Sequence, residues 1–159
     1  MSDASPPTSQ TRVTLVVPLA PGRIFDLLAT PRRLAEIDAS GTIVSVDNAA
    51  PVTATGQTFT LNMVATGGPE PVPYRAEHRV HAFEQDRVIA WSVAPVDGDP
   101  DGWSWRFDLT PLDGERTEVA LTYDWSQVSP DTAARYGIPD HDSLDLEASL
   151  TRLAMAAKK

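Results

Sequence analysis

The feature that most constrains this chain is a change in hydrophobic period near residue 42. From there six segments are predicted to be strands: 42–48, 55–65, 74–83, 87–96, 102–112 and 117–126. Apolar and polar side chains alternate in most of them, less regularly in 74–83, whereas 87–96 is rich in β-branched residues. Alternation is typical of strands with one buried face, because successive side chains point to opposite sides of a strand. Segment 102–112 shows it most clearly, with one face made of Trp103, Trp105, Phe107 and Leu109.

The links between these segments predict how the strands pair. Residues 84–86, 97–102 and 113–115 are short and rich in Asp and Gly, which is typical of hairpin turns. Strands joined in this way run antiparallel. Segment 12–19 adds a seventh strand, so we expect one antiparallel sheet of seven strands.

A sheet with one apolar face needs a cover, and helical segments flank the strands. Residues 21–31 and 32–37 predict two short helices, and a short helix or turn begins at Ser129-Pro130. A longer C-terminal helix is capped by Asp140 or Asp142. Its apolar stripe consists of Leu146, Leu150, Leu153 and Ala157. The predicted fold class is α+β, a curved sheet around one long helix, and we expect a cavity between the two.

Length and composition predict one domain. The chain has 159 residues, of which 42% are hydrophobic. Residues 1–10 are small, polar and without periodicity, so we interpret them as a flexible tail before a single domain at 11–159.

The net charge and the residue composition limit the kinds of partner that we expect for this protein. The net charge is −9 and the only lysines are Lys158 and Lys159, which argues against nucleic acid as a partner. No apolar run is long enough to insert into a membrane. Cysteine is absent, and no nucleotide or zinc-protease motif is present, so we predict no cofactor and no metal. The expected location is the cytoplasm, and the expected state is a monomer or a homodimer paired through an edge strand.

Three segments carry a family resemblance: 17–43, 82–91 and 102–126. Together with the order of elements, they resemble the START-like or SRPBCC superfamily, whose fold is called the helix grip. Within that superfamily, the three segments are most similar to a bacterial branch described as polyketide cyclase/dehydrase or lipid-transport-like. The resemblance covers roughly residues 11–157 and implies a fold with a ligand cavity, but it implies no shared catalytic set.

Two apparent metal motifs have simpler interpretations. Residues 97–108 match part of a calcium-loop pattern, yet Asp108 stands where a bidentate Glu is needed and Pro100 interrupts the loop. His78 and His81 look like a metal pair, but residues three apart on a strand point to opposite faces. We therefore expect His78 to face inward and His81 outward.

The candidate site consists of inward-facing residues of the sheet and the long helix. His78 is either a hydrogen-bonded core residue or the polar group of a pocket. If the protein is an enzyme of the polyketide cyclase, aromatase or dehydratase type, the catalytic candidates are His78, Tyr74 and Tyr123. The ligand-binding candidates are Phe59, Leu61, Met63, Tyr74, His78, Trp91, Trp103, Trp105, Phe107, Tyr123, Leu146, Leu150 and Asp38.

The acidic stretch at 34–42 is interpreted first as structural. Leu34 and Ile37 face the core, Asp38 accepts hydrogen bonds from the following turn, and Glu36 faces solvent. Gly41 can adopt a positive φ where the chain reverses. Asp38 is also placed so that it can lie at the entrance of the cavity.

Three function hypotheses follow. The first is binding of a hydrophobic or amphipathic small molecule, such as a lipid, an isoprenoid or a polyketide-like compound. The second is a cyclase or dehydratase that uses a cavity His or Tyr. The third is a protein-interaction module with an acidic surface.

Overall fold

A computed structural model of the chain describes residues 9–38, 43–47, 50–65, 69–95, 102–136, 138–139 and 142–158. Seven strands form one sheet. Their bounds are β1 Gln10–Val17, β2 Ile43–Asp47, β3 Thr58–Ala65, β4 Val72–Glu84, β5 Val88–Pro95, β6 Ser104–Asp113 and β7 Arg116–Asp124.

All neighbouring strands in the sheet run antiparallel, in the order β1-β7-β6-β5-β4-β3-β2. Five of the six pairings join strands that follow each other in sequence, and only β1 pairs with a distant strand, β7. The short β2 and the longer β1 are therefore the edges. The seven-stranded antiparallel sheet predicted from the alternation is confirmed.

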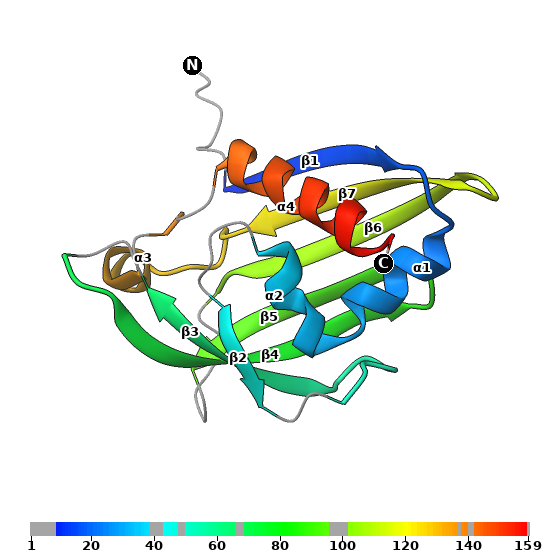
Figure 1. Cartoon of the computed structure of the whole chain (residues 1–159). Helices are drawn as coiled ribbons and strands as arrows, with labels where there is room; N and C mark the ends of the chain where they lie inside the picture. Colours follow the sequence, from blue (N-terminus) through cyan, green and yellow to red (C-terminus); the bar gives the residue numbers. More distant parts are fainter. Residues whose placement is uncertain are drawn as a thin grey trace, which may run out of the picture.

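Helices cover one face of this sheet (Figure 1). The helix α1 spans Pro21–Leu28, a 3₁₀ turn covers Pro31–Arg33, and α2 spans Leu34–Ile37. A short α3 at Pro130–Tyr136 lies at one end of the sheet, and α4 spans Ser143–Ala156 across its concave side. Together these elements form the helix-grip architecture.

The sequence explains where α1 and α4 begin. Pro21 occupies the first turn of α1, where a missing N–H removes no helical hydrogen bond. Asp142 is the N-cap of α4, one of the two caps that the sequence offered. Its side chain accepts from the backbone N–H of Asp145 at 3.0 Å, and the Asp145 side chain accepts from the Asp142 N–H at 3.1 Å. This reciprocal capping box satisfies two donors that the helix leaves unpaired.

The core lies between the sheet and α1, α2 and α4. The apolar stripe of α4 is buried as predicted, at Leu146, Leu150, Leu153 and Ala157. These residues pack in one cluster with Ile24, Phe25, Leu27 and Leu28 of α1 and with inward residues of the strands. Burial of this apolar surface is the main force that holds the helices on the sheet.

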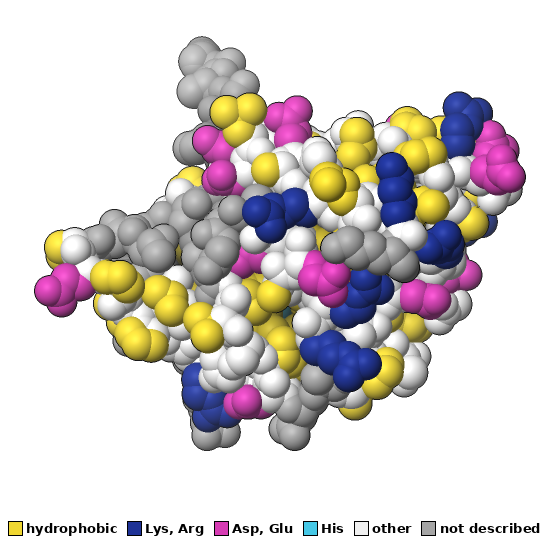
Figure 2. All heavy atoms as spheres, in the orientation of Figure 1, with side chains coloured by type: hydrophobic (Ala, Val, Ile, Leu, Met, Phe, Trp, Pro, Cys, Tyr) yellow, Lys and Arg dark blue, Asp and Glu magenta, His cyan; other side chains and the backbone are white. Residues whose placement is uncertain are grey.

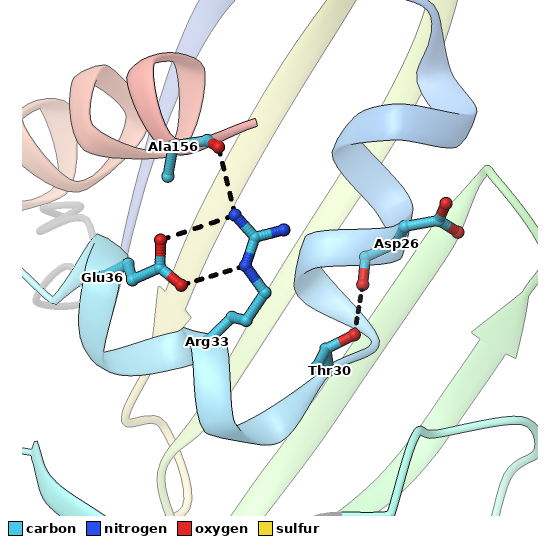
Figure 3. Close-up of polar contacts among 5 residues, drawn as sticks. All are labelled: Asp26, Thr30, Arg33, Glu36 and Ala156. Atoms are coloured by element: carbon cyan, nitrogen blue, oxygen red, sulfur yellow. Dashed lines mark hydrogen bonds and ion pairs between the residues drawn. The ribbon is translucent and has the colours of Figure 1, made fainter. Parts of the chain in front are cut away.

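Two arginines hold the C-terminal end of α4. Arg33 donates to the Ala156 carbonyl at 3.1 Å and pairs with Glu36, Nε to Oε2 at 2.9 Å (Figure 3). Arg23 donates to the Lys158 carbonyl at 3.0 Å. Carbonyls at a helix C-terminus lack intrahelical partners and attract cations, so both contacts stabilise this end of α4.

The structure corrects some local predictions. Glu36 is exposed as predicted, and the structure adds that it pairs with Arg33. β6 begins at Ser104, one residue after Trp103, although the Trp103 carbonyl still accepts from the Val93 N–H at 3.2 Å. β1 begins at Gln10, inside the predicted tail.

Several other predictions fall on residues that are not described. Residues 1–8 of the tail and residues 96–101, which hold most of the calcium-like pattern, lie outside the described residues. The same is true of Ala39 to Thr42, including the turn glycine Gly41.

Candidate functional site

A cavity of about 100 Å³ lies between the sheet, α2 and the N-terminal half of α4. Figure 2 shows hydrophobic side chains in a hollow at the centre of the face that carries α2 and β2. The sheet forms the floor and the two helices form the rim. The wall residues are Leu34, Ile37, Asp38, Ile43, Leu61, Met63, His78, Trp91, Trp105, Phe107, Leu121, Asp145, Leu146 and Ser149.

The floor follows from the pairing register of the strands. Trp91 of β5 lies opposite Trp105 of β6, and Trp105 lies opposite Tyr123 of β7. Side chains in such a row share one face of the sheet, here the concave one. Trp105 and Tyr123 stack with ring centroids 4.4 Å apart, while Trp91 packs against Phe107 at 5.9 Å. Aromatic rings thus form a large part of the cavity floor.

The rim combines apolar and acidic side chains. Ile37 and Asp38 come from the end of α2, and Asp145 and Ser149 come from α4, where their spacing of four places them on one helix face. Asp38, Asp145 and Ser149 are half-buried, whereas Ile37 is buried. Asp38 also holds the local backbone, since its Oδ2 accepts from the Ile43 N–H at 2.8 Å. The prediction that Asp38 accepts a backbone hydrogen bond is confirmed.

His78 is the buried polar residue of the floor. It is 3% exposed, and the only other buried polar side chain among the described residues is Thr117, which lies outside the cavity wall. The His78 ring stacks on Phe59 with centroids 5.1 Å apart. His81, by contrast, is exposed, so the two histidines face opposite sides of β4 as predicted.

The hydrogen bond of the His78 ring determines its tautomer. Nδ1 lies 3.2 Å from the Ala76 carbonyl oxygen, which can only accept, so Nδ1 carries the proton and Nε2 is an acceptor. Burial lowers the pKa of His78 to about 4, and the hydrogen bond to Ala76 opposes this only in part. The ring is therefore neutral near pH 7.

The cavity wall includes eight of the thirteen predicted ligand-binding residues: Asp38, Leu61, Met63, His78, Trp91, Trp105, Phe107 and Leu146. The other five lie outside the wall. Phe59 supports His78, Tyr123 supports Trp105, and Trp103 and Leu150 belong to the packed core. Tyr74 is partly buried against that core. Contact of any of the thirteen with a ligand stays a prediction.

The catalytic set proposed from the sequence does not converge on the cavity. His78 lines it, but neither Tyr74 nor Tyr123 does. The sequence analysis also did not select six wall residues: Leu34, Ile37, Ile43, Leu121, Asp145 and Ser149. For Asp145 and Ser149, a usable signal was their position beside the apolar stripe of the last helix.

Two further findings concern the part of the chain that the structure describes. It contains no group of three or more His, Cys, Asp or Glu side chains placed to hold a metal ion. None of its helices is both long and apolar enough to cross a bilayer.

Sequence comparison gives little about function. No family model matches the chain. An uncharacterized protein of Mycobacterium tuberculosis is 30% identical over 123 residues, which cover 77% of this chain and 50% of that protein. The chain thus spans about half the length of the curated relatives it matches.

Structural comparison identifies the fold. A Chromobacterium violaceum protein superposes with a TM-score of 0.66 at 15% identity, covering 96% of this chain and 99% of that one. The Zhui aromatase/cyclase from Streptomyces superposes with a TM-score of 0.62 at 17% identity, covering 94% of this chain and 93% of that one. Norcoclaurine synthase from Thalictrum flavum superposes with a TM-score of 0.62 at 11% identity, covering 94% of this chain and 86% of that one. That structure is a complex with dopamine and hydroxybenzaldehyde. The chain has the helix-grip fold of START-like (SRPBCC) proteins.

Proposed function

We propose that this protein binds a small hydrophobic molecule containing an aromatic ring in the cavity between the sheet and α4. The observation that carries the proposal is the wall itself, which is apolar and aromatic except for His78 and a few rim groups. Ligand sites typically combine apolar walls with a small number of placed polar groups. Two structural neighbours support it: one is an aromatase/cyclase, and another is complexed with dopamine and hydroxybenzaldehyde.

The size of the cavity indicates the size of the ligand. Its volume of about 100 Å³ is of the same order as the cavity of roughly 150 Å³ that accepts benzene in another protein. Sites for drug-sized molecules occupy roughly 300–1,000 Å³. One ring therefore fits with little adjustment, whereas a lipid tail or a polyketide requires the rim of α2 and α4 to move outward.

A direct test uses p-cresol and 2-naphthol, titrated by calorimetry and by NMR of the backbone amides. Ser149→Phe places a ring in the cavity, while Ala148→Phe places the same ring on the exposed side of α4. We expect p-cresol to bind the natural protein and Ala148→Phe equally, and Ser149→Phe about tenfold more weakly or not at all. Failure of both compounds to bind the natural protein would overturn the proposal.

An enzyme that uses the same cavity is the second candidate, and the observation in its favour is the buried ring of His78. A general base works best when its pKa lies near the working pH. With a pKa of about 4, His78 is a weak base near neutrality and is better suited to accept a hydrogen bond. The test is whether the natural protein converts a ketone probe while His78→Gln does not, although both bind p-cresol. That result would support an enzyme over a protein that only binds its ligand.

A further inference from the structure

The imidazole ring of His78 is fixed by three neighbours. Nδ1 donates to the Ala76 carbonyl oxygen at 3.2 Å. The ring stacks on Phe59, with centroids 5.1 Å and planes 17° apart, and it meets Trp91 at a tilt of 59° with centroids 6.5 Å apart. Packing and a hydrogen bond together lock a side chain in one orientation. The direction of the second ring nitrogen, Nε2, is therefore fixed as well.

Nε2 of His78 faces the open space of the cavity. It has no hydrogen-bond partner among the described residues. In the same part of the chain, no fully enclosed side-chain nitrogen or oxygen lacks a partner, so Nε2 is not fully enclosed. Since His78 lines the cavity and is only 3% exposed, the space beside Nε2 is the cavity itself. With the proton on Nδ1, Nε2 offers a lone pair to whatever enters.

The other polar groups of the wall depend less on a ligand. The carboxylates of Asp38 and Asp145 already accept backbone N–H groups, and Asp38 and Trp105 have further interactions within the protein. Ser149 is half-buried at the rim, where water can reach its hydroxyl group. Nε2 of His78 thus differs from all of them as a deeply buried acceptor. A ligand that covers it without supplying a donor loses the hydrogen bond that water would make there.

The depth of His78 determines which end of a ligand can reach it. His78 belongs to the sheet that forms the floor, whereas Asp38, Asp145 and Ser149 form the half-buried rim. The hollow opens on the face of the molecule that carries α2 and β2 (Figure 2). A donor that bonds to Nε2 therefore has to point inward, away from this opening.

We infer that the cavity binds its ring compound with a neutral O–H or N–H group directed inward to Nε2 of His78, and with the opposite end of the ring toward α2 and α4. This inference rests on the proposed function and specifies the ligand class and its orientation. Phenols and other ring compounds with an unhindered donor satisfy Nε2. Hydrocarbons and ethers of the same size leave it without a partner.

The first test compares p-cresol with p-xylene, which has a methyl group in place of the hydroxyl and nearly the same shape. A purely apolar cavity would prefer p-xylene, because it is the more hydrophobic compound. A site built around a hydrogen bond rejects the analogue that lacks the donor. By calorimetry we expect p-cresol to bind the natural protein at least about tenfold more tightly than p-xylene.

A pair of isomers tests the orientation. In 3,4-dimethylphenol both methyl groups lie away from the hydroxyl, and in 2,6-dimethylphenol they crowd it from both sides. If the hydroxyl points inward to His78, the 3,4-isomer should bind at least about tenfold more tightly, because only its O–H can approach Nε2 closely. Equal affinity of the two isomers would contradict the inward orientation.

His78→Leu removes the acceptor and keeps the position apolar. The preference for p-cresol should then vanish or reverse in favour of p-xylene, whereas His78→Gln retains an acceptor oxygen and should keep part of it. The matched control is Met63→Leu, a swap of similar volume in the same wall, which should leave the preference near tenfold. The readout is a ratio of two affinities within one variant, so a general loss of stability affects both compounds alike.

A spectroscopic measurement on the natural protein does not depend on any variant. Proton–nitrogen correlation spectra of the imidazole rings report whether each ring nitrogen accepts a hydrogen bond. The Nε2 resonance of His78 should shift much more with p-cresol than with p-xylene, and the signals of His81 and His141 should stay in place.

The outcomes separate this inference from the proposed function. If p-xylene binds the natural protein as tightly as p-cresol, ring binding stands and the hydrogen bond to His78 is wrong. An unchanged preference in His78→Leu, or no shift of Nε2 with bound p-cresol, also overturns the inference. If neither compound binds, the proposed function itself fails.

Discussion

The two ends of α4 meet the rest of the molecule in different ways. In the C-terminal half, Leu153 and Ala156 are buried in the core. The carbonyls at this end accept hydrogen bonds from Arg23 and Arg33. The N-terminal half is held by its own capping box, and it contributes Asp145, Leu146 and Ser149 to the cavity wall.

This difference separates a half of α4 that is fixed on the core from a half that borders the cavity. The C-terminal end is fixed by packing and by charge-assisted hydrogen bonds from α1 and the 3₁₀ turn. The N-terminal end borders a hollow, where Asp145, Leu146 and Ser149 line the cavity wall. Local stability is rarely uniform, and segments that bind ligands are often drawn from its less stable part.

The largest expected effect contrasts two leucines of the same stripe. Leu153→Ala should lower the free energy of unfolding by about 3–4 kcal/mol, because it opens a void in close-packed surroundings. Leu146→Ala should lower it by only about 2 kcal/mol, because one side of Leu146 already faces the cavity. Urea unfolding of the two variants measures both values. Equal losses would contradict the division of α4 into a packed half and a hollow half.

The second effect concerns pH and the cavity floor. His78 has a folded pKa of about 4, below its ordinary value of 6.5, so the unfolded chain binds the proton more readily. The stability that depends on neutral His78 is present above pH 6.5 and is lost as the pH falls toward 4. Between pH 7 and pH 5 this loss amounts to about 2 kcal/mol.

His78→Gln provides the comparison for this pH effect, because glutamine does not titrate. The variant should lack this part of the pH dependence, whatever its stability at pH 7. Asp38 and Asp145 also line the cavity and remain in both proteins, so they affect the two curves alike. Parallel unfolding curves for the natural protein and the variant from pH 7 to pH 5 would show that His78 does not titrate in this way.

The third effect tests the fixed end of α4. Arg33→Met keeps much of the aliphatic stem and removes the hydrogen bonds to Glu36 and to the Ala156 carbonyl, for an expected loss of about 1–2 kcal/mol. Arg32→Met is the control, since Arg32 is exposed and adjacent. Thermal unfolding compares them, and amide exchange at Ala156 to Lys158 should speed up only in the Arg33 variant. Similar shifts in both variants would argue against an anchoring role for Arg33.

The smallest effect lies at the other end of α4. Asp142→Ala removes one half of the capping box and should lower stability by about 1 kcal/mol, whereas Asp142→Asn should change it by only a few tenths. Because the backbone N–H of Asp145 loses its acceptor and the first turn of α4 is less firmly held, we also expect weaker binding of p-cresol in the Ala variant. A full-sized stability loss with Asn would indicate that the negative charge, rather than the cap geometry, stabilises this end.

Much of the fold could be predicted from local patterns. Alternation in residues 102–112 and 117–126 indicates which faces of β6 and β7 are buried, and short Asp- and Gly-rich links indicate antiparallel neighbours. The spacing of Leu146, Leu150 and Leu153 likewise predicts the buried face of α4. These signals are readable because side-chain direction repeats with a fixed period within each element.

The contact between Arg33 and Ala156 could not be predicted in the same way. Arg33 and Ala156 are 123 residues apart in the chain, and nothing local indicates that they meet. Their contact depends on how the 3₁₀ turn and α4 are placed on the same sheet, which is decided by packing. For Asp145 and Ser149 the position beside the apolar stripe of α4 was a local signal, but packing decided that this part of the stripe borders a cavity.

What the sequence by itself determined is which side chains face the interior, including His78 and the aromatic rows of β5, β6 and β7. What only the tertiary structure decided is which of these border a cavity and which are sealed in the core. Trp105 and Tyr123 are cross-strand neighbours that stack on one face of the sheet. Trp105 nevertheless lines the cavity, whereas Tyr123 is fully buried in the core. The physical reason is that a period of two specifies a face, whereas a void depends on how closely α2 and α4 approach that face.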